Sequence, residues 1–593
     1  MKKILSVALL MATLVNCQSN QSEKTATTSN PDFATVLDNY YEQRLKLFPV
    51  EATQQGDNRY NDRFPNDISQ AFLEETKTFY TGTLEKLNTF DREKLSDEDK
   101  ISYDILKREM ALQLEPYPFH QEEMPFNQFT GNTLAFGQLG SGEGAQPFKT
   151  VKDYDDWLKR VSAFAVWGDT AIAAFRQGMA TNRILPKSLV VKMIPQMTDL
   201  VVTDPTKSLF YGPIRKLPQS FSAAEKERLT TAYQKAITGQ IVPTYRKLGA
   251  FLKDEYLPKA RTSSGIDVIP QGPELYRYLV NVQTTTNDTP EEIHQLGLKE
   301  VARIRGEMEK VKTQVGFNGS LNEFFTHLKA DKRFYPYKQP KDVLDAFHTI
   351  LAKIEPNLKK DFINTPKSKF EIRQTEKFRE ASASAEYNQA SADGSRPGIF
   401  YVPIPDATQF NVTSGMESLF LHEAIPGHHY QVSLQQENTS LPKFRRFAWY
   451  GAYGEGWALY CESLGKELGL YTDPYQYMGA LGDEMHRAIR LVVDTGIHTK
   501  HMTREQAIQY MMDNEPIAEQ GAVAEIERYM AISGQALSYK IGALKIRELR
   551  AKYEKQLGEK FSLAAFHDEF LKDGCMPLDV LERKMNTWAD QQK

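Results

Sequence analysis

The sequence predicts a mainly α-helical protein with one small β element, and three observations lead to this fold class. Between about residues 32 and 380, apolar side chains recur at three- and four-residue spacing, which is typical of helices with one buried face. Capped helix starts, prolines and glycines punctuate these segments. A short run of β-branched and aromatic residues between turn signals, Ile399–Val402, predicts a strand.

The amino-acid composition limits the possible functions only weakly. The chain is 41% hydrophobic and 25% charged with a net charge of −4, which is ordinary for a globular protein. It has no basic excess, so nucleic acid is not an expected partner. Its few cysteines exclude a disulfide scaffold and a cysteine-based zinc site, and the pairing of Cys461 and Cys575 stays open.

The N-terminal segment predicts export. Met1–Val15 has a basic start and an apolar run too short to span a bilayer stably, as in a secretory signal peptide. Leu14–Cys17 resembles a bacterial lipobox, which implies residues 1–17 as a lipoprotein signal peptide with Cys17 lipidated. No aspartate follows Cys17, so the analogy favours the outer membrane, facing the periplasm, over the inner membrane. Ordinary secretion is the alternative, and polar residues 18–31 predict a flexible tether.

Helical periodicity then continues through the first half of the chain. The strongest segments span residues 33–45, 101–112, 157–175 and 223–256. Thr289, followed by proline and two glutamates, predicts a capped helix start, and Pro340–Asp342 is similar. Residues 126–142 are rich in glycine, aromatics and amides, and predict either a cleft lining or a surface connection.

Three of the eleven histidines fall within Leu421–Tyr430, which reads L-H-E-A-I-P-G-H-H-Y. Neutral imidazole is the commonest side-chain ligand of a catalytic zinc, and Glu423 beside His422 could act as a general base. A helix end with surface histidines is the alternative, but the clustering favours a metal site.

The histidine spacing differs from H-E-x-x-H, in which two ligands four residues apart share a helix face. On a straight helix, His428 would point about 120° away from His422, and His429 would lie about 10 Å further along the axis. Pro426 lacks an N–H and Gly427 permits unusual backbone angles, so the pair predicts a broken helix that turns His428 back. His429 remains the alternative ligand.

Two further segments carry candidate polar residues. Tyr453–Leu464 predicts a buried helix in which Glu455 and Glu462 lie two turns apart on one face, and a glutamate there is costly to ionise unless paired or bound to a metal. Arg490, Asp494 and His498 follow at four-residue intervals, which predicts an oriented network with His498 facing the cleft. A purely structural ion-pair network is the alternative.

The motif around His422, together with Gly454–Glu462 (G-E-G-W-A-L-Y-C-E), resembles a large bacterial family known as domain of unknown function 885, often lipoproteins. Those proteins look distantly similar to the gluzincin zinc metallopeptidases, such as thimet oligopeptidase and the thermostable carboxypeptidases. The resemblance covers most of the mature chain and is sharpest from about residue 390 to 545. It implies a multi-helical, two-lobed metallopeptidase-like fold with a deep central cleft and a small β element beside the metal site. We divide the chain into an N-terminal helical region, 32–380, and a helical catalytic region, 381–593, both parts of one cleft-forming unit.

The resemblance also implies roles for individual residues. The ligands of one Zn²⁺ per chain would be His422, His428 and Glu455. Around them would lie a second set of side chains: Glu462, Asp494, Arg490 and His429. Glu455 and Glu462 could exchange roles, so both assignments stay open.

A gluzincin-like edge strand would pair with the substrate backbone, and this role falls on Ile399, Phe400 and Tyr401, with Pro403 closing the strand. A buried hairpin without a substrate role is the alternative. Tyr539, with Tyr529 as second choice, is implied as the residue that stabilises the oxyanion, and Arg528 could hold a substrate carboxylate.

We therefore predict a zinc-dependent metallopeptidase acting on short peptides in the cell envelope, attached to the membrane by its lipid anchor alone. Glu423 would be the general base, and Tyr539 or His498 would meet the oxyanion. The alternatives are a metal-dependent hydrolase of a non-peptide amide or ester, and a non-catalytic metal-binding envelope lipoprotein. The sequence leaves the oligomeric state open.

Overall fold

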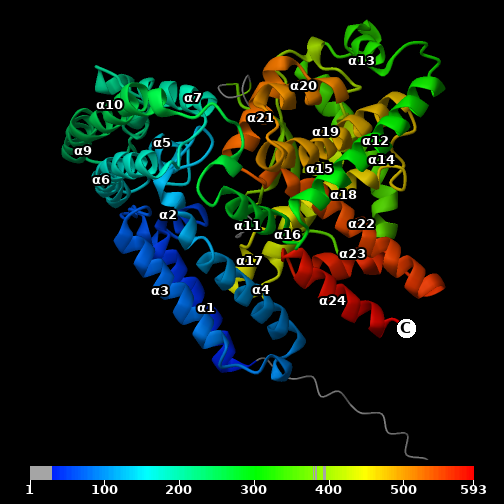
Figure 1. Ribbon diagram of the computed structural model, residues 1–593, viewed down its shortest axis with the longest axis horizontal. Coiled ribbons are helices and arrows are strands. Elements are labelled where there is room, and N and C mark those ends of the chain that lie inside the picture. The colour runs from blue at the N-terminus through cyan, green and yellow to red at the C-terminus, as the bar shows by residue number, and fades with distance from the viewer. Residues whose placement is uncertain (1–29, 378–379, 381–383, 391–395) are drawn as a thin grey trace, which may run out of the picture.

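Helices form most of the described chain, and one small three-stranded sheet accompanies them, which confirms the predicted mainly α class. The computed structural model describes residues 30–377, 380, 384–390 and 396–593 (Figure 1). The predicted signal peptide, the predicted lipidation site Cys17 and residues 18–29 of the predicted tether lie outside the described residues. Across the described ranges, no helix has both the length and the apolar composition needed to cross a bilayer.

The first helices form a slender layer at one side of the molecule (Figure 1). Asn30 caps the first of them by accepting hydrogen bonds from the backbone N–H groups of Asp32 and Phe33, and Pro31 occupies the first turn. Asn30 and Pro31 therefore belong to this helix and not to the predicted tether. The helices of this layer are α1 (Pro31–Leu47), α2 (Pro49–Gln54), α3 (Gln70–Leu87) and α4 (Asp97–Leu114).

A second group of helices has a hydrophobic core of its own, rich in stacked aromatic rings. Phe136 and Phe164 stack at a centroid distance of 3.9 Å, and a Cβ on Gly140 would lie only 2.3 Å from Trp157. Segment 126–142, for which the sequence predicted either a cleft lining or a surface connection, thus contributes a helix and core side chains. We call this group the α5–α10 unit: α5 (Asn132–Gly140), α6 (Val151–Thr181), α7 (Lys187–Thr198), α8 (Gly212–Arg215), α9 (Ala223–Ala236) and α10 (Val242–Phe251).

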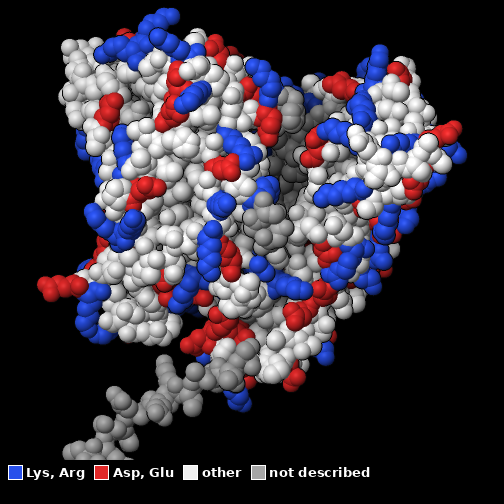
Figure 2. All heavy atoms as spheres, turned by 180° about the vertical axis from the view of Figure 1, so that it is seen from behind, with Lys and Arg blue, Asp and Glu red and all other residues white. Residues whose placement is uncertain are grey.

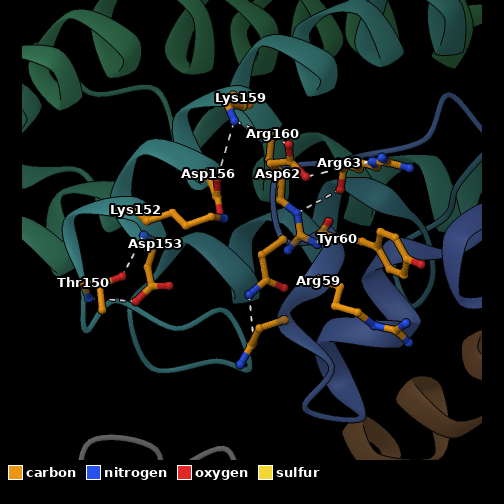
Figure 3. Close-up of polar contacts among 12 residues, drawn as sticks. Arg59, Tyr60, Asp62, Arg63, Thr150, Lys152, Asp153, Asp156, Lys159 and Arg160 are labelled. Atoms are coloured by element: carbon orange, nitrogen blue, oxygen red, sulfur yellow. Dashed lines mark hydrogen bonds and ion pairs between the residues drawn. The ribbon is translucent and has the colours of Figure 1, made fainter.

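Arg160 on α6 joins this unit to the turn after α2 (Figure 3). Its guanidinium is fully buried and donates to the backbone oxygens of Pro49, Tyr60 and Arg63 at 3.2, 3.2 and 2.9 Å. Burial lowers the pKa of Arg160 to about 10. Because residues 54–56 of the same segment line the main cavity, this joint helps to fix one of its walls.

The next helices begin as the sequence predicts. Thr289 forms a capping box with Glu292 at the start of α12, and Gln339 precedes Pro340 at the start of α14. These helices and their neighbours are α11 (Gly272–Thr284), α12 (Pro290–Gln314), α13 (Leu321–Ala330) and α14 (Pro340–Asp361).

The C-terminal helices build the body of the molecule. Helix α19 packs along α12, and α18 packs along α22, where Gly456 and Gly542 let the two backbones approach closely. The body contains α15 (Met416–Glu423), α16 (His428–Glu437), α17 (Lys443–Arg446), α18 (Gly451–Ser463), α19 (Pro474–Thr499), α20 (Arg504–Asn514), α21 (Glu519–Ala531), α22 (Ser538–Leu557), α23 (Leu563–Leu571) and α24 (Leu578–Gln591).

The small sheet has the order β1-β3-β2, with β1 (Phe370–Gln374) parallel and β2 (Glu386–Asn388) antiparallel to β3 (Gly398–Val402). The predicted strand is therefore β3, and it is central. Every residue of β3 is buried, whereas β2 lies at an edge and borders the main cavity.

The largest hydrophobic core contains side chains from both predicted regions. It joins Phe33 and Tyr103 of the first helices to Leu549 of α22 and Trp588 of α24. Cys461 and Cys575 are free and buried, so they are not bonded to each other.

Candidate metal centre

The chain between α15 and α16 folds back on itself at the predicted position. Helix α15 ends at Glu423 and α16 begins at His428, which confirms the predicted break at Pro426-Gly427. A Cβ on Gly427 would lie 1.8 Å from the carbonyl oxygen of His422, so only glycine allows this close approach. The turn brings the rings of His422 and His428 to a centroid distance of 5.0 Å.

Glu455 of α18 completes this group. Its Oε2 atom lies 3.5 Å from Nε2 of His422 and 3.5 Å from Nε2 of His428. His422, Glu423 and His428 each offer one possible ligand atom, and these three atoms also lie within 4.8 Å of one another. Two imidazole nitrogens and two carboxylates thus converge at one point, and Glu455 faces both imidazoles while Glu423 approaches from the end of α15.

Glu462 orients the first imidazole from behind. Nδ1 of His422 donates to Oε1 of Glu462 at 2.7 Å, which leaves Nε2 of His422 directed toward Glu455. The described structure therefore places Glu455 at the convergence point and Glu462 behind it. This is the arrangement of the two glutamates that the resemblance implies.

The charge balance at this point favours a cation. Burial would lower the pKa of His422, but the carboxylates of Glu455 and Glu462 outweigh it and raise the pKa to about 10. Burial would raise the pKa of Glu455, yet hydrogen bonding to His422 and His428 holds it well below the usual range. Nδ1 of His428 is buried and has no hydrogen-bond partner within the described chain.

His429 points elsewhere. Its Nδ1 lies 2.9 Å from the hydroxyl of Tyr387 on β2, and burial lowers its pKa to about 4. Since His428 and not His429 joins His422 and Glu455, the geometry favours His428 of the two candidate ligands. His429 instead supports the strand that contacts Glu423.

Tyr387 also holds the candidate base. Its backbone N–H donates to Oε2 of Glu423 at 3.0 Å, so β2 fixes the carboxylate beside the two imidazoles. Sequence analysis missed this residue, although it lies in the turn-rich segment directly before β3.

The predicted substrate strand is wrong as assigned. Ile399, Phe400 and Tyr401 belong to the central strand β3, which pairs with β1 on one side and β2 on the other. A continuous apolar run is typical of a strand that is covered on both faces, and this signal argued against an edge. Pro403 ends the strand without marking an edge, and β2 takes the edge position.

The metal candidates open onto a cavity of about 1370 Å³. Its wall includes Arg490, Arg528 and Tyr539, and the guanidinium of Arg490 lies 4.7 Å from the ring centre of Tyr539. Arg528 donates to the side-chain oxygen of Gln535 at 2.9 Å. Tyr529, the second candidate, is buried and donates to Glu525. Figure 2 shows the surface hollowed between the α5–α10 unit and the body, with acidic and basic side chains on both sides.

The predicted Arg490-Asp494-His498 network is wrong. Arg490 donates to Tyr529 and Glu525, whereas Asp494 accepts from the hydroxyl of Tyr276 at 2.6 Å. Burial raises the pKa of Asp494 to about 7. The three residues share a helix face, but their hydrogen bonds go to other residues: Arg490 and His498 both contact Tyr529, at its hydroxyl and its carbonyl, and Asp494 contacts Tyr276.

His498 does not face the cavity. It is completely buried, its Nδ1 accepts from the N–H of Ile266, and its Nε2 donates to the carbonyl of Tyr529. Both ring nitrogens are used structurally, so His498 cannot meet an oxyanion.

Two more residues of the cavity wall were not predicted from the sequence as part of the site. Trp449 lies in the connection before α18, with its ring 5.9 Å from that of His428. His486 of α19 contacts Glu515 and Glu525. The one available signal was an aromatic residue in the loop just before the helix that carries Glu455.

Comparison with known proteins gives a family and a fold. A family model described as "Bacterial protein of unknown function (DUF885)" matches residues 49–585, and no curated protein matches the chain. The crystal structure of a putative lipoprotein from Colwellia psychrerythraea is 29% identical, with a TM-score of 0.84 over 94% of this chain and 99% of that one. A putative lipoprotein of unknown function from Shewanella oneidensis is 20% identical, with a TM-score of 0.74 over 93% and 99%; at that identity the likeness is one of fold.

Proposed function

The chain belongs to the DUF885 family of bacterial proteins of unknown function, and from its site we propose that it is a zinc-dependent peptidase. One observation carries the proposal. Nε2 of His422 and Nε2 of His428 each lie 3.5 Å from the same oxygen of Glu455, at the edge of a large cavity. Two imidazoles and one carboxylate are a common ligand set of catalytic zinc.

The residues present fit the metal. The hydrogen bond from Nδ1 of His422 to Glu462 selects the tautomer whose Nε2 can bind a cation. Two histidines and a glutamate favour zinc among the common divalent ions. Because zinc prefers four ligands, these three protein ligands would leave one coordination position open. When bound, zinc supplies Lewis acidity that lowers the pKa of a water molecule and polarises a substrate carbonyl.

Glu423 acts as the general base. It takes a proton from the attacking water and later gives that proton to the leaving amine. The N–H of Tyr387 holds its Oε2 atom, so the carboxylate is oriented before substrate arrives. Tyr539, which lines the same cavity, would donate a hydrogen bond to the developing oxyanion.

The cavity also suits a short peptide. We propose β2 in place of β3 as the strand that contacts the substrate, because β2 is the edge strand that lines the cavity, although the N–H of Tyr387 is already used by Glu423. Arg528 binds a substrate carboxylate. The proposal includes a two-lobed, gluzincin-like arrangement, in which the α5–α10 unit would face the catalytic helices across a deep cleft.

We further propose that the protein is a lipoprotein of the cell envelope, anchored through Cys17 and facing the periplasm from the outer membrane. The lipobox-like sequence before Cys17 supports this location. Two solved relatives bear the description of putative lipoproteins.

The test is metal content together with peptide hydrolysis. The parent protein should hold about one zinc by elemental analysis, and His422→Ala, His428→Ala and Glu455→Ala should lose it. His429→Gln is the matched control, because His429 neighbours His428 but contacts Tyr387. Zinc lost only from His429→Gln would contradict the ligand set.

Glu423→Gln separates catalysis from metal binding. This variant should keep its zinc while hydrolysis of a peptide library falls by about 10²–10⁴-fold, the usual contribution of a general base. Zinc-loaded parent protein that cleaves esters but no peptide would favour the non-peptide hydrolase. Zinc without any hydrolysis would favour a metal-binding lipoprotein.

A further inference from the structure

Trp449 is an exposed aromatic residue inside the main cavity. Its side chain is 49% exposed, unlike the other tryptophans of the core such as Trp157, Trp167 and Trp457. Leaving a large aromatic surface in water is unfavourable by roughly 25 cal/mol per Å². A half-exposed indole at the wall of a candidate active site therefore has surface available for a ligand.

The backbone on both sides of Trp449 is anchored to the body. The buried amide of Gln435 donates to the carbonyl of Ala448 at 2.9 Å, and the N–H of Tyr450 lies 3.1 Å from Sγ of buried Cys575. Gln435 belongs to α16, the helix that begins at His428. The loop is thus tied to the same element that carries a candidate ligand.

A glycine provides the seat for the indole ring. A Cβ on Gly454 would lie 2.2, 2.5 and 2.8 Å from three ring atoms of Trp449, so the ring lies directly on the backbone of α18. Gly454 immediately precedes Glu455. The indole is therefore positioned by the two helices that supply His428 and Glu455, and its ring centre lies 5.9 Å from that of His428.

The cavity wall has further apolar side chains. Phe447 and Ala448 line the cavity next to Trp449, and Leu419 and Val432 contribute from α15 and α16. A prepositioned aromatic surface binds an apolar side chain at low entropic cost, because little further ordering is needed. Its distance from the metal ligands suits a side chain directly beside the bond that is cleaved.

We propose that Trp449 is a stacking platform that selects peptides with an aromatic side chain next to the scissile bond. The inference rests on the proposed peptidase function, because it identifies the substrate class of the same site. Gly454 is glycine because the indole occupies the space of its side chain.

Binding measurements test the proposal without depending on turnover. Capped glycine-serine hexapeptides that carry either Phe or Ala at one position are titrated calorimetrically into zinc-loaded Glu423→Gln protein, with Phe and Ala scanned along the peptide. At the preferred position the Phe peptide should bind about tenfold more tightly, as expected for one aromatic contact. Adding Trp449→Ala should abolish the difference, and Trp449→Phe should keep part of it.

Phe129→Ala is the matched control, because Phe129 is 40% exposed and lies outside the described cavity wall. It should leave the preference unchanged. Equal affinities for the Phe and Ala peptides, or a preference that survives Trp449→Ala, would overturn the proposal. Parent protein that cleaves no peptide would refute the peptidase function separately, since the binding comparison is still measurable.

Discussion

His422, His428 and His429 are distinguished by what their second ring nitrogen contacts. Nδ1 of His422 donates to Glu462, Nδ1 of His429 faces Tyr387, and Nδ1 of His428 is buried without a described partner. A carboxylate behind an imidazole raises its basicity toward a metal, whereas a phenol near a neutral ring does not. The three side chains therefore have unequal affinity for a cation despite being close in sequence.

His498 provides a residue-scale prediction on stability. Burial lowers its pKa to about 3, compared with about 6.5 in an unfolded chain. The unfolded state binds the proton more tightly, so stability is lost as pH falls below about 6.5. Between pH 7.5 and 5.0 this single group should remove about 2 kcal/mol from the free energy of unfolding.

His498→Asn removes the titrating group and keeps an acceptor for the N–H of Ile266. Urea unfolding should show a loss of about 1–3 kcal/mol at pH 7.5 and a flatter dependence on pH, with kcat of the folded protein unchanged. His501→Asn is the control, because His501 is largely exposed and has a positive φ that asparagine tolerates. A fall in kcat with unchanged stability would contradict the structural role of His498 and would favour a role in the candidate active site.

The positions of residues were predictable where sequence spacing decides geometry. Pro426 and Gly427 predicted the turn that selects His428, because both residues restrict the backbone in known ways. The role of Tyr387 was not predictable, since a backbone N–H leaves no signal in the sequence. Likewise, the four-residue spacing of Arg490, Asp494 and His498 predicted a shared face but not the partners across it.

At the scale of elements, the turn between α15 and α16 makes the site possible. Gly427→Ala should displace His428, because the added Cβ would meet the carbonyl oxygen of His422 at 1.8 Å. We expect zinc content to fall well below one per chain while circular dichroism still shows a helical protein. Gly482→Ala on α19 is the control, since no atom lies within 4 Å of its added Cβ. Full zinc occupancy in Gly427→Ala would contradict this account of the turn.

The sheet shows why an element can be predicted but misplaced. Ile399–Val402 was correctly predicted as a strand from its residue types, yet its position in the sheet depends on partners distant in sequence. In the pairing of β1 with β3, Phe370 lies opposite Gly398, which is 28 residues later in the sequence. Edge or centre is therefore a tertiary property, and the continuous apolar run was its only local sign.

For the whole molecule, the joint at Arg160 links the α5–α10 unit to the first helices. Arg160→Met would leave the carbonyls of Pro49, Tyr60 and Arg63 without their buried donor. We expect a loss of about 3 kcal/mol in the free energy of unfolding and faster hydrogen exchange in residues 49–63. Lys159→Met, at the neighbouring and exposed position, should change stability by less than about 0.5 kcal/mol. Equal stability of the two variants would show that the joint contributes little.

The mainly α class followed from local periodicity, whereas the grouping of helices did not. Segments 33–45 and 157–175 have the same pattern, yet Phe33 joins the largest core and Phe164 joins the core of the α5–α10 unit. The apolar pattern of a helix predicts which of its faces is buried, but it does not predict which other helix covers that face.

The largest core has a consequence for folding during synthesis. It contains Ile105 and Leu106 of α4 together with Leu581 and Met585 of α24, and α4 and α24 pack against each other (Figure 1). A chain made from its N-terminus cannot close this core until residues near 585 have emerged from the ribosome. Until then its early helices keep apolar faces uncovered, and such a chain remains accessible to chaperones. The protein can therefore reach its native state only after its last helix has been synthesised.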